Sequence, residues 1–195
     1  MPEEYVSCEM RNNIEFWAIF NGDYRKNTKI IINKGYNVLG SILMLNPGSA
    51  NCIGEEDSKG YQLCELDKTM KEIKFIFYEF SKHNKGIVKI VNLSDLRQPN
   101  MEKFFKDPHF KTLIQIENEL EDSSWVWVAW TCKDNKELRG LQAHLLGYIQ
   151  DNKPFFGKKG KLKNGYYHPG VRLKSQKLEL EEEIKKELKK LTLTS

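Results

Sequence analysis

The sequence predicts an α/β fold, a single-domain three-layer sandwich with a mainly parallel central sheet. Short apolar runs alternate with stretches in which apolar residues recur at helical spacing, and this alternation favours strands joined by helices. The chain shows no internal repeat and no Pro/Ser-rich linker, so we expect one domain over residues 1–195, with its core over about residues 14–174. An amphipathic C-terminal helix is expected over about residues 177–191.

The N-terminal part predicts a β-hairpin followed by a buried strand. Residues 14–20 and 28–33 are predicted strands, and the turn signal Asn21-Gly22-Asp23 lies between them. We expect this hairpin to add to one edge of the sheet. Residues 40–45 form an apolar run that predicts the first buried strand.

The middle of the chain predicts a polar loop, a helix and a second buried strand. The loop runs from Ser49 to about Leu66, and Asp67 after it is a typical helix N-cap. Apolar residues at helical spacing then continue to Asn84, namely Met70, Ile73, Phe77 and Phe80. Residues 87–91 predict the next strand, which ends at Asn92.

The C-terminal half predicts a helix over 110–120, a buried strand over 125–130 and a helix over 136–148. Residues 151–165 are polar and rich in lysine, which is typical either of a mobile, solvated loop or of a flexible phosphate clamp. The lysines in question are Lys153, Lys158, Lys159, Lys161 and Lys163.

Composition indicates an ordinary globular protein. Of its 195 residues, 30% are charged and 39% are apolar, and the net charge of +4 permits a nucleic-acid partner without arguing for one. No apolar stretch is long enough to span a bilayer and no secretory signal is visible, so we expect no membrane partner and a cytoplasmic location. The four cysteines form no Cys-x-x-Cys pair, which favours reduced thiols over a metal site. The oligomeric state stays open.

Asn46-Pro47-Gly48 is the most informative motif, because it stands where a buried apolar run stops. Pro47 fixes the direction in which the chain leaves the strand, and Gly48 permits a tight turn. Ligands of open α/β sheets bind at the carboxyl ends of strands, so Asn46 is placed like a site residue. A turn-forming role alone would also explain an Asn before Pro-Gly.

Two further polar groups stand at corresponding places. Asn92 ends the next buried strand, and His168 lies in a turn rich in Gly and Pro. Two amides and an imidazole can read the edge of a planar heterocycle, since an amide offers donors and an acceptor in one plane. A strand-end cap for Asn92 and an exposed loop position for His168 are the plainer alternatives.

Leu45-Asn46-Pro47-Gly48 resembles the first active-site motif of the mismatch-specific and thymine-DNA glycosylases, which belong to the uracil-DNA glycosylase superfamily. Asn92 falls where that superfamily has a base-recognising Asn, and His168-Pro169 resembles the start of its late His-Pro-Ser motif. The resemblance implies a uracil-DNA-glycosylase-like fold. Gly170 and Val171 replace the Ser and the following Leu that enters the duplex, which favours an unpaired substrate.

Five motifs in order resemble a second family, an uncharacterised bacterial and phage family named domain of unknown function 1643. The resemblance covers about residues 40–174, and Gly48 stands where that family usually has Ser. The matching segments are Met44 to Ala50, Asp67-Lys68-Thr69, Val91-Asn92-Leu93, Val128-Ala129-Trp130 and Asn164 to Pro169.

The resemblance implies hydrolysis of the bond between a nucleobase and deoxyribose, with no cofactor. Asn46 would orient the water, Asn92 would read the base, and His168 would stabilise charge on the base oxygen. The alternative is a non-catalytic pocket that binds or sequesters a nucleotide of bacterial or phage origin. The expected partner is single-stranded or mismatched DNA, or a free nucleotide.

Further residues are candidates for ligand binding beside Pro47 and Gly48. Asp67 and Thr69 stand at a helix N-terminus and suit a nucleotide or sugar, although helix capping is the favoured explanation of this segment. Arg97 can hold a phosphate bidentately or simply lie on the surface. Tyr61 and Trp130 are candidates for stacking on a base, with core packing as the alternative for Trp130.

Overall fold

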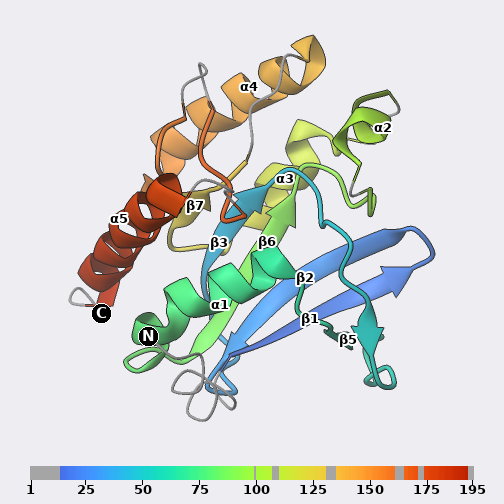
Figure 1. The fold of residues 1–195 in the computed structure, drawn as a ribbon, viewed down its shortest axis with the longest axis vertical. Helices are drawn as coiled ribbons and strands as arrows, with labels where there is room; N and C mark the ends of the chain where they lie inside the picture. The colour runs from blue at the N-terminus through green and yellow to red at the C-terminus, as the bar shows by residue number, and fades with distance from the viewer. Residues whose placement is uncertain are drawn as a thin grey trace.

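The computed structural model describes residues 14–98, 100–106, 110–130, 135–160, 165–170 and 174–192. These residues form one sheet of eight strands, with five helices packed around it (Figure 1). The strands are β1 (Ile14–Asn21), β2 (Tyr24–Ile32), β3 (Val38–Met44), β4 (Cys52–Ile53), β5 (Gln62–Cys64), β6 (Gly86–Asn92), β7 (Val126–Val128) and β8 (Phe155–Phe156). The helices are α1 (Lys68–Ser81), α2 (Met101–Lys106), α3 (Leu113–Leu120), α4 (Lys136–Asn152) and α5 (Lys174–Thr192).

The sheet has the strand order β4-β5-β1-β2-β6-β3-β7-β8 and is mixed, which corrects the prediction of a mainly parallel sheet. Within the described residues, four of the seven strand pairings are antiparallel and three are parallel. The parallel half is β6-β3-β7-β8. The N-terminal hairpin lies inside the sheet and not at its edge, because β2 pairs with β6 while β1 pairs with β5.

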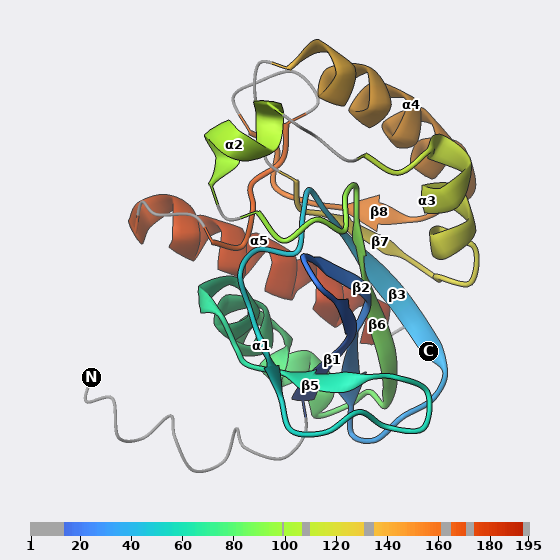
Figure 2. The same ribbon diagram turned by 90° about the vertical axis from the view of Figure 1, so that its right-hand side faces the viewer.

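Helices cover both faces of the sheet, as expected of an α/β sandwich (Figure 2). Helices α1 and α5 pack on one face, where Ile42 and Met44 of β3 point into a shared core. Helices α3 and α4 pack on the other, where Leu43 and Leu45 point. Successive side chains of β3 therefore pack alternately into the two cores, as in a strand that is buried on both sides.

Helices α1, α4 and α5 and strands β1, β3 and β6 lie close to where the sequence predicts them. Strand β2 begins at Tyr24, earlier than the predicted residues 28–33, and β7 covers only Val126–Val128 of the predicted strand over 125–130. Strands of two or three residues, such as β4, β5 and β8, carry too little alternation to be recognised. Helix α3 begins at Leu113 because Thr112 is its N-cap, accepting from Gln115 N–H while the Gln115 side chain accepts from Thr112 N–H. The six-residue helix α2 was not expected in the loop after β6.

Helix α1 confirms the expected N-cap. The Asp67 side chain accepts from Met70 N–H at 2.8 Å, and the apolar stripe of the helix is buried against the sheet.

Candidate functional site

The turn after β3 lies against Asp67, the residue immediately before α1. Gly48 has a φ of +71°, the left-handed region that favours glycine. A Cβ at this position would lie 3.2 Å from Asp67 Oδ2, so the backbone of the turn passes close to the carboxylate. The Asn-Pro-Gly motif and the Asp67 cap, which are far apart in the sequence, therefore belong to one site.

Asn46 connects this turn to the segment after β6. Its side chain is half-buried, and Nδ2 donates to the Gln98 carbonyl at 2.9 Å. The bond holds the two loops at the carboxyl ends of β3 and β6 together. It also occupies Nδ2, one of the two side-chain atoms through which Asn46 can bind a ligand.

Asn92 is the last residue of β6 and is 1% exposed. It pairs in register with Met44 and shares a strand face with Ile90, so its side chain points toward the face covered by α1. Its Oδ1 is buried and has no hydrogen-bond partner among the described residues. A buried acceptor without a partner costs about 1–3 kcal/mol, which a ligand that donates a hydrogen bond would recover.

His168 lies in a turn that is pinned to the chain before it. Tyr167 N–H donates to the Lys158 carbonyl at 2.8 Å, and Tyr166 bridges to Lys159. The His168 Nδ1 accepts from Gly170 N–H at 3.0 Å. In a neutral imidazole the remaining nitrogen, Nε2, then carries the proton and is a donor.

Burial lowers the pKa of His168 from 6.5 to about 4, against the opposing influence of the Asp67 carboxylate. The ring is therefore neutral at pH 7, which agrees with the tautomer that the Gly170 bond selects. A neutral Nε2–H can donate to an oxygen that gains negative charge without first losing a proton.

The turn at His168 also touches the start of α1. A Cβ at Gly170 would lie 3.1 Å from both His168 Nδ1 and Thr69 Oγ1, so only a residue without a side chain fits there comfortably. Asp67, Thr69 and His168 are thus brought together, and the turn after β3 adjoins them through Gly48. These are the groups that the sequence predicted as a site.

Arg25 belongs to the same region but was missed by the sequence analysis. It is 3% exposed, its Nη2 donates to the Pro47 carbonyl, and its Nε and Nη1 are buried without a hydrogen-bond partner among the described residues. Burial lowers the pKa of the Arg25 guanidinium, and Cys64 and Asp67 act in the opposite direction.

An irregularity in β2 explains why alternation hides Arg25. Trp17 pairs with Lys29 but Ile19 pairs with Lys26, so β2 carries one extra residue, and Asn27 there has a φ of 50°. This bulge shifts the phase of the strand and turns Arg25 to the same buried face as Thr28. Because β2 also carries Lys26 and Lys29, positive charge alone does not distinguish Arg25, and the sequence holds no local signal for its burial.

The remaining candidates are placed differently. Arg97 is half-buried beside the turn after β3, where it donates to Asn51 Oδ1 at 2.7 Å. The Tyr61 ring lies under Lys29 Nζ, 3.3 Å from its centroid, on the face of β2 opposite to Thr28. Trp130 is fully buried in the core on the α3 and α4 side, with its ring edge-to-face to Tyr166.

The Lys-rich segment is partly committed to structure. Lys153 Nζ donates to the Glu121 carbonyl at 2.6 Å, and Lys158 pairs with Glu179 of α5 at 2.8 Å. These two lysines therefore act as ties between elements. Other residues singled out from the sequence lie outside the described residues, namely Lys161, Lys163, Asn164 and Val171.

The described residues hold neither a membrane-spanning helix nor a cluster of metal ligands. No helix there has the length and apolar character needed to cross a membrane. No group of three or more His, Cys, Asp and Glu side chains there is arranged to hold a metal ion. Comparison with known proteins adds no relative, since no family model, no curated protein and no solved structure matches the chain.

Proposed function

We propose that the chain recognises a nucleobase at the carboxyl ends of β3 and β6 and hydrolyses the bond between that base and deoxyribose. Membership of the uracil-DNA glycosylase superfamily, through the family of unknown function that the five motifs resemble, is part of this proposal. The observation that carries it is the buried Asn92 side chain, whose Oδ1 lacks a partner among the described residues at the end of a strand.

The donor and acceptor groups suit a base with an N–H beside a carbonyl, such as uracil, thymine or hypoxanthine. Asn92 Oδ1 accepts from the ring N–H, and the Asn92 amide donates to the neighbouring carbonyl. His168 donates through Nε2–H to the base oxygen that becomes negative as the base departs. Because the pKa of His168 is low, the ring is uncharged at pH 7 and donates this hydrogen bond as a neutral imidazole.

The water that attacks the sugar needs an acceptor for its proton. Asn46 orients this water through its amide oxygen but is too weak a base to take the proton. Asp67 lies beside Gly48, with Oδ1 committed to the Met70 N–H and Oδ2 toward the turn after β3. Asp67 is therefore the general base in this proposal, and the developing oxocarbenium ion also gains from its negative charge.

A second function is binding without cleavage. The observation that favours it is the bond between Asn46 Nδ2 and the Gln98 carbonyl, which gives Asn46 a role in holding two loops together. In that case Asn92 and His168 recognise the base edge in the same way, but no bond breaks. The chain then sequesters a nucleotide and releases it unchanged.

The test is the formation of abasic sites in single- and double-stranded DNA containing uracil, or containing thymine or hypoxanthine mismatches. The proposal expects cleavage, fastest on single strands, and loss of cleavage in Asn92→Ala. Asn118→Ala, at an exposed position of α3, is the matched control and retains activity. Absence of cleavage together with Asn92-dependent binding of a deoxynucleoside would support the second function. Absence of both would overturn both.

A further inference from the structure

Two arginines approach the turn after β3 from neighbouring backbone segments. Arg25 lies near the start of β2, and Arg97 follows β6. Their backbones are paired, because Arg25 N–H donates to the Asp95 carbonyl at 2.9 Å, Arg97 N–H donates to the Asp23 carbonyl at 2.7 Å, and Tyr24 bridges to Leu96 between them. The pairing is antiparallel, so Arg25 and Arg97 lie on opposite sides of the bridge between Tyr24 and Leu96.

Both guanidinium groups reach the same loop. Arg25 Nη2 donates to the Pro47 carbonyl, and Arg97 Nη2 donates to Asn51 Oδ1 at 2.7 Å and, more weakly, to the Ser49 carbonyl at 3.5 Å. All three acceptors are neutral oxygens. The loop therefore brings two positive charges together without neutralising either of them.

The nearby carboxylates form no ion pair with either arginine among the described residues. Asp95, whose carbonyl accepts from Arg25, directs its carboxylate to Lys111 Nζ at 2.9 Å. Asp67, the carboxylate that acts on Arg25 through space, caps α1 through Oδ1.

Both arginines also keep buried donors unused. Arg25 Nε and Nη1 and Arg97 Nε are buried and have no hydrogen-bond partner among the described residues. A buried guanidinium is normally paired, because an isolated buried charge is costly. Arg97 adds to the cost by lowering the pKa of Arg25, although burial is the larger cause. An anion that accepts from both groups would supply partners for some of these donors and offset the two positive charges.

We infer that Arg25 and Arg97 together bind a phosphate group of the ligand whose base is read by Asn92. Guanidinium groups match phosphate oxygens with two parallel hydrogen bonds, and a dianion or diester oxygen pair suits two arginines. The inference rests on the proposed function for the identity of the base. It adds that the ligand is a nucleotide, whether free or part of a strand, and that Arg25 is a binding residue.

The experiment measures binding and thermal stability in phosphate-free buffer at fixed ionic strength, with inorganic phosphate, deoxyuridine, deoxyuridine 5′-monophosphate and a uracil-containing single strand as separate probes. We expect phosphate to raise the melting temperature and the monophosphate to bind at least about tenfold more tightly than the nucleoside. Arg25→Met and Arg97→Gln should each abolish this advantage. Lys26→Gln, an exposed cation beside Arg25 on β2, should retain it.

Equal affinities for nucleoside and monophosphate in the wild type, with no shift in phosphate, overturn the inference and leave the proposed base site standing. Binding of phosphate and monophosphate with no binding of any nucleoside supports the inference and overturns base recognition. If Arg25 only braces the loop, Arg25→Met lowers the melting temperature without phosphate and leaves the effect of phosphate intact, which also contradicts the inference. Arg97→Gln gives an independent test should Arg25→Met not fold.

The source of the phosphate follows from the two nucleotide probes. A strand that binds more tightly than the monophosphate, with a salt dependence that weakens by about one charge in Arg97→Gln, identifies nucleic acid. A monophosphate that the strand fails to displace identifies a free nucleotide. Either outcome supports the arginine pair, and failure of both probes to respond to the two variants overturns it.

Discussion

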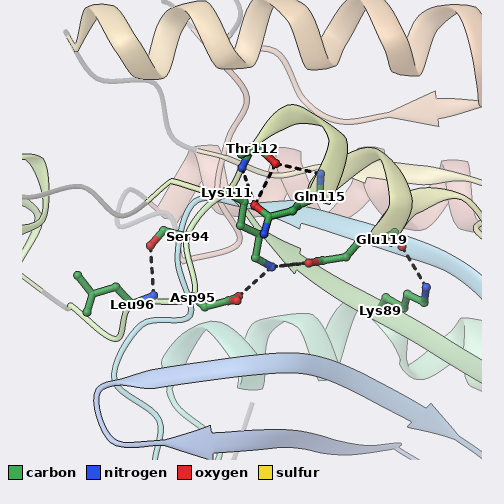
Figure 3. A network of polar contacts seen from close by, with 8 residues as sticks. All are labelled: Lys89, Ser94, Asp95, Leu96, Lys111, Thr112, Gln115 and Glu119. Atoms are coloured by element: carbon green, nitrogen blue, oxygen red, sulfur yellow. Dashed lines mark hydrogen bonds and ion pairs between the residues drawn. The ribbon is translucent and has the colours of Figure 1, made fainter.

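Two groups of polar side chains flank strand β6, one on each face of the sheet, and they differ in how completely they are paired. On the side of α3, Lys111 Nζ contacts Asp95 at 2.9 Å and Glu119 at 2.8 Å, while Lys89 Nζ donates to the Glu119 carbonyl (Figure 3). On the side of α1, the buried atoms Arg25 Nε, Thr28 Oγ1 and Asn92 Oδ1 have no partner among the described residues.

The two groups lie close together, on opposite faces of the sheet at β6. Their difference in pairing therefore does not come from lying in different parts of the fold. The paired group fastens α3 and the segment after β6 to the sheet, which is a structural task. Within the unpaired group, Arg25 lies against the turn after β3 through the Pro47 carbonyl and feels the charge of Asp67, the N-cap of α1. Polar groups that are kept buried without partners cost stability, and we interpret that cost as the consequence of reserving them for a ligand.

Of the changes that test this contrast, substitution of Asp67 should have the greatest consequence, a loss of catalytic activity. Asp67→Asn removes the proposed base but keeps a side chain that caps α1 as well as aspartate does. Cleavage of uracil-containing DNA should fall by about 10²-fold or more, with the free energy of unfolding changed by less than about 0.5 kcal/mol. Full activity in this variant would remove Asp67 from the mechanism, and an unfolded variant would mean that it is structural.

The next effect concerns the neutral imidazole of His168 and its dependence on pH. His168 titrates near 4 in the folded chain and near 6.5 when unfolded, so the unfolded state binds the proton first as pH falls. The contribution of His168 to stability is therefore complete above about pH 6.5 and is lost progressively toward pH 4, by about 3 kcal/mol in total.

Denaturant unfolding at several pH values measures this loss as the difference between wild type and His168→Gln, which lacks the titrating group. His83→Gln, at an exposed position, serves as control and should follow the wild type. Parallel curves for the wild type and His168→Gln would show that the ring is not buried in its neutral form.

A change in the paired group should cost stability. Lys111→Met leaves Asp95 and Glu119 without their shared cation, and the Lys111 side chain is only 12% exposed. We expect a loss of about 2 kcal/mol in the free energy of unfolding, with ligand binding retained. Lys103→Met, at an exposed position of α2, should change stability by less than about 0.5 kcal/mol. An equally small effect of Lys111→Met would break the contrast between the two groups.

The smallest effect has the opposite sign. Asn92→Leu replaces an unpaired buried amide with an apolar side chain of similar size, so it should raise the free energy of unfolding by about 1 kcal/mol. Asn118→Leu, which is exposed, should leave stability nearly unchanged. Destabilisation by Asn92→Leu would mean that this amide contributes to the fold.

Much of the framework could be predicted from the sequence because it depends on local patterns. Apolar runs identified the strands that became β3 and β6, and a cap followed by a helical stripe identified α1. His168 was a candidate because His168-Pro169 resembles a glycosylase motif, and Asn92 followed from the rule that strand ends meet at one edge. That rule holds here because β3 and β6 are parallel neighbours.

The rest depended on pairings between distant segments. The bulge at Asn27 reverses which face of β2 is buried, so alternation counted from Ile32 places Arg25 on the wrong side. Tyr61 and Trp130 were chosen for their ring chemistry, but strand pairing decides which face they occupy. No local pattern records that decision, and the insertion of the N-terminal hairpin into the sheet was missed for the same reason.

The central claim is that the unpaired groups beside α1 are reserved for a ligand. Calorimetric titration of wild type and Asn92→Leu with deoxyuridine, thymidine and deoxyinosine, alongside unfolding of both proteins, tests it most directly. We expect at least one nucleoside to bind the wild type and to bind the variant about tenfold more weakly or worse, although the variant is the more stable protein. Unchanged affinity in a variant that is less stable than the wild type would contradict it.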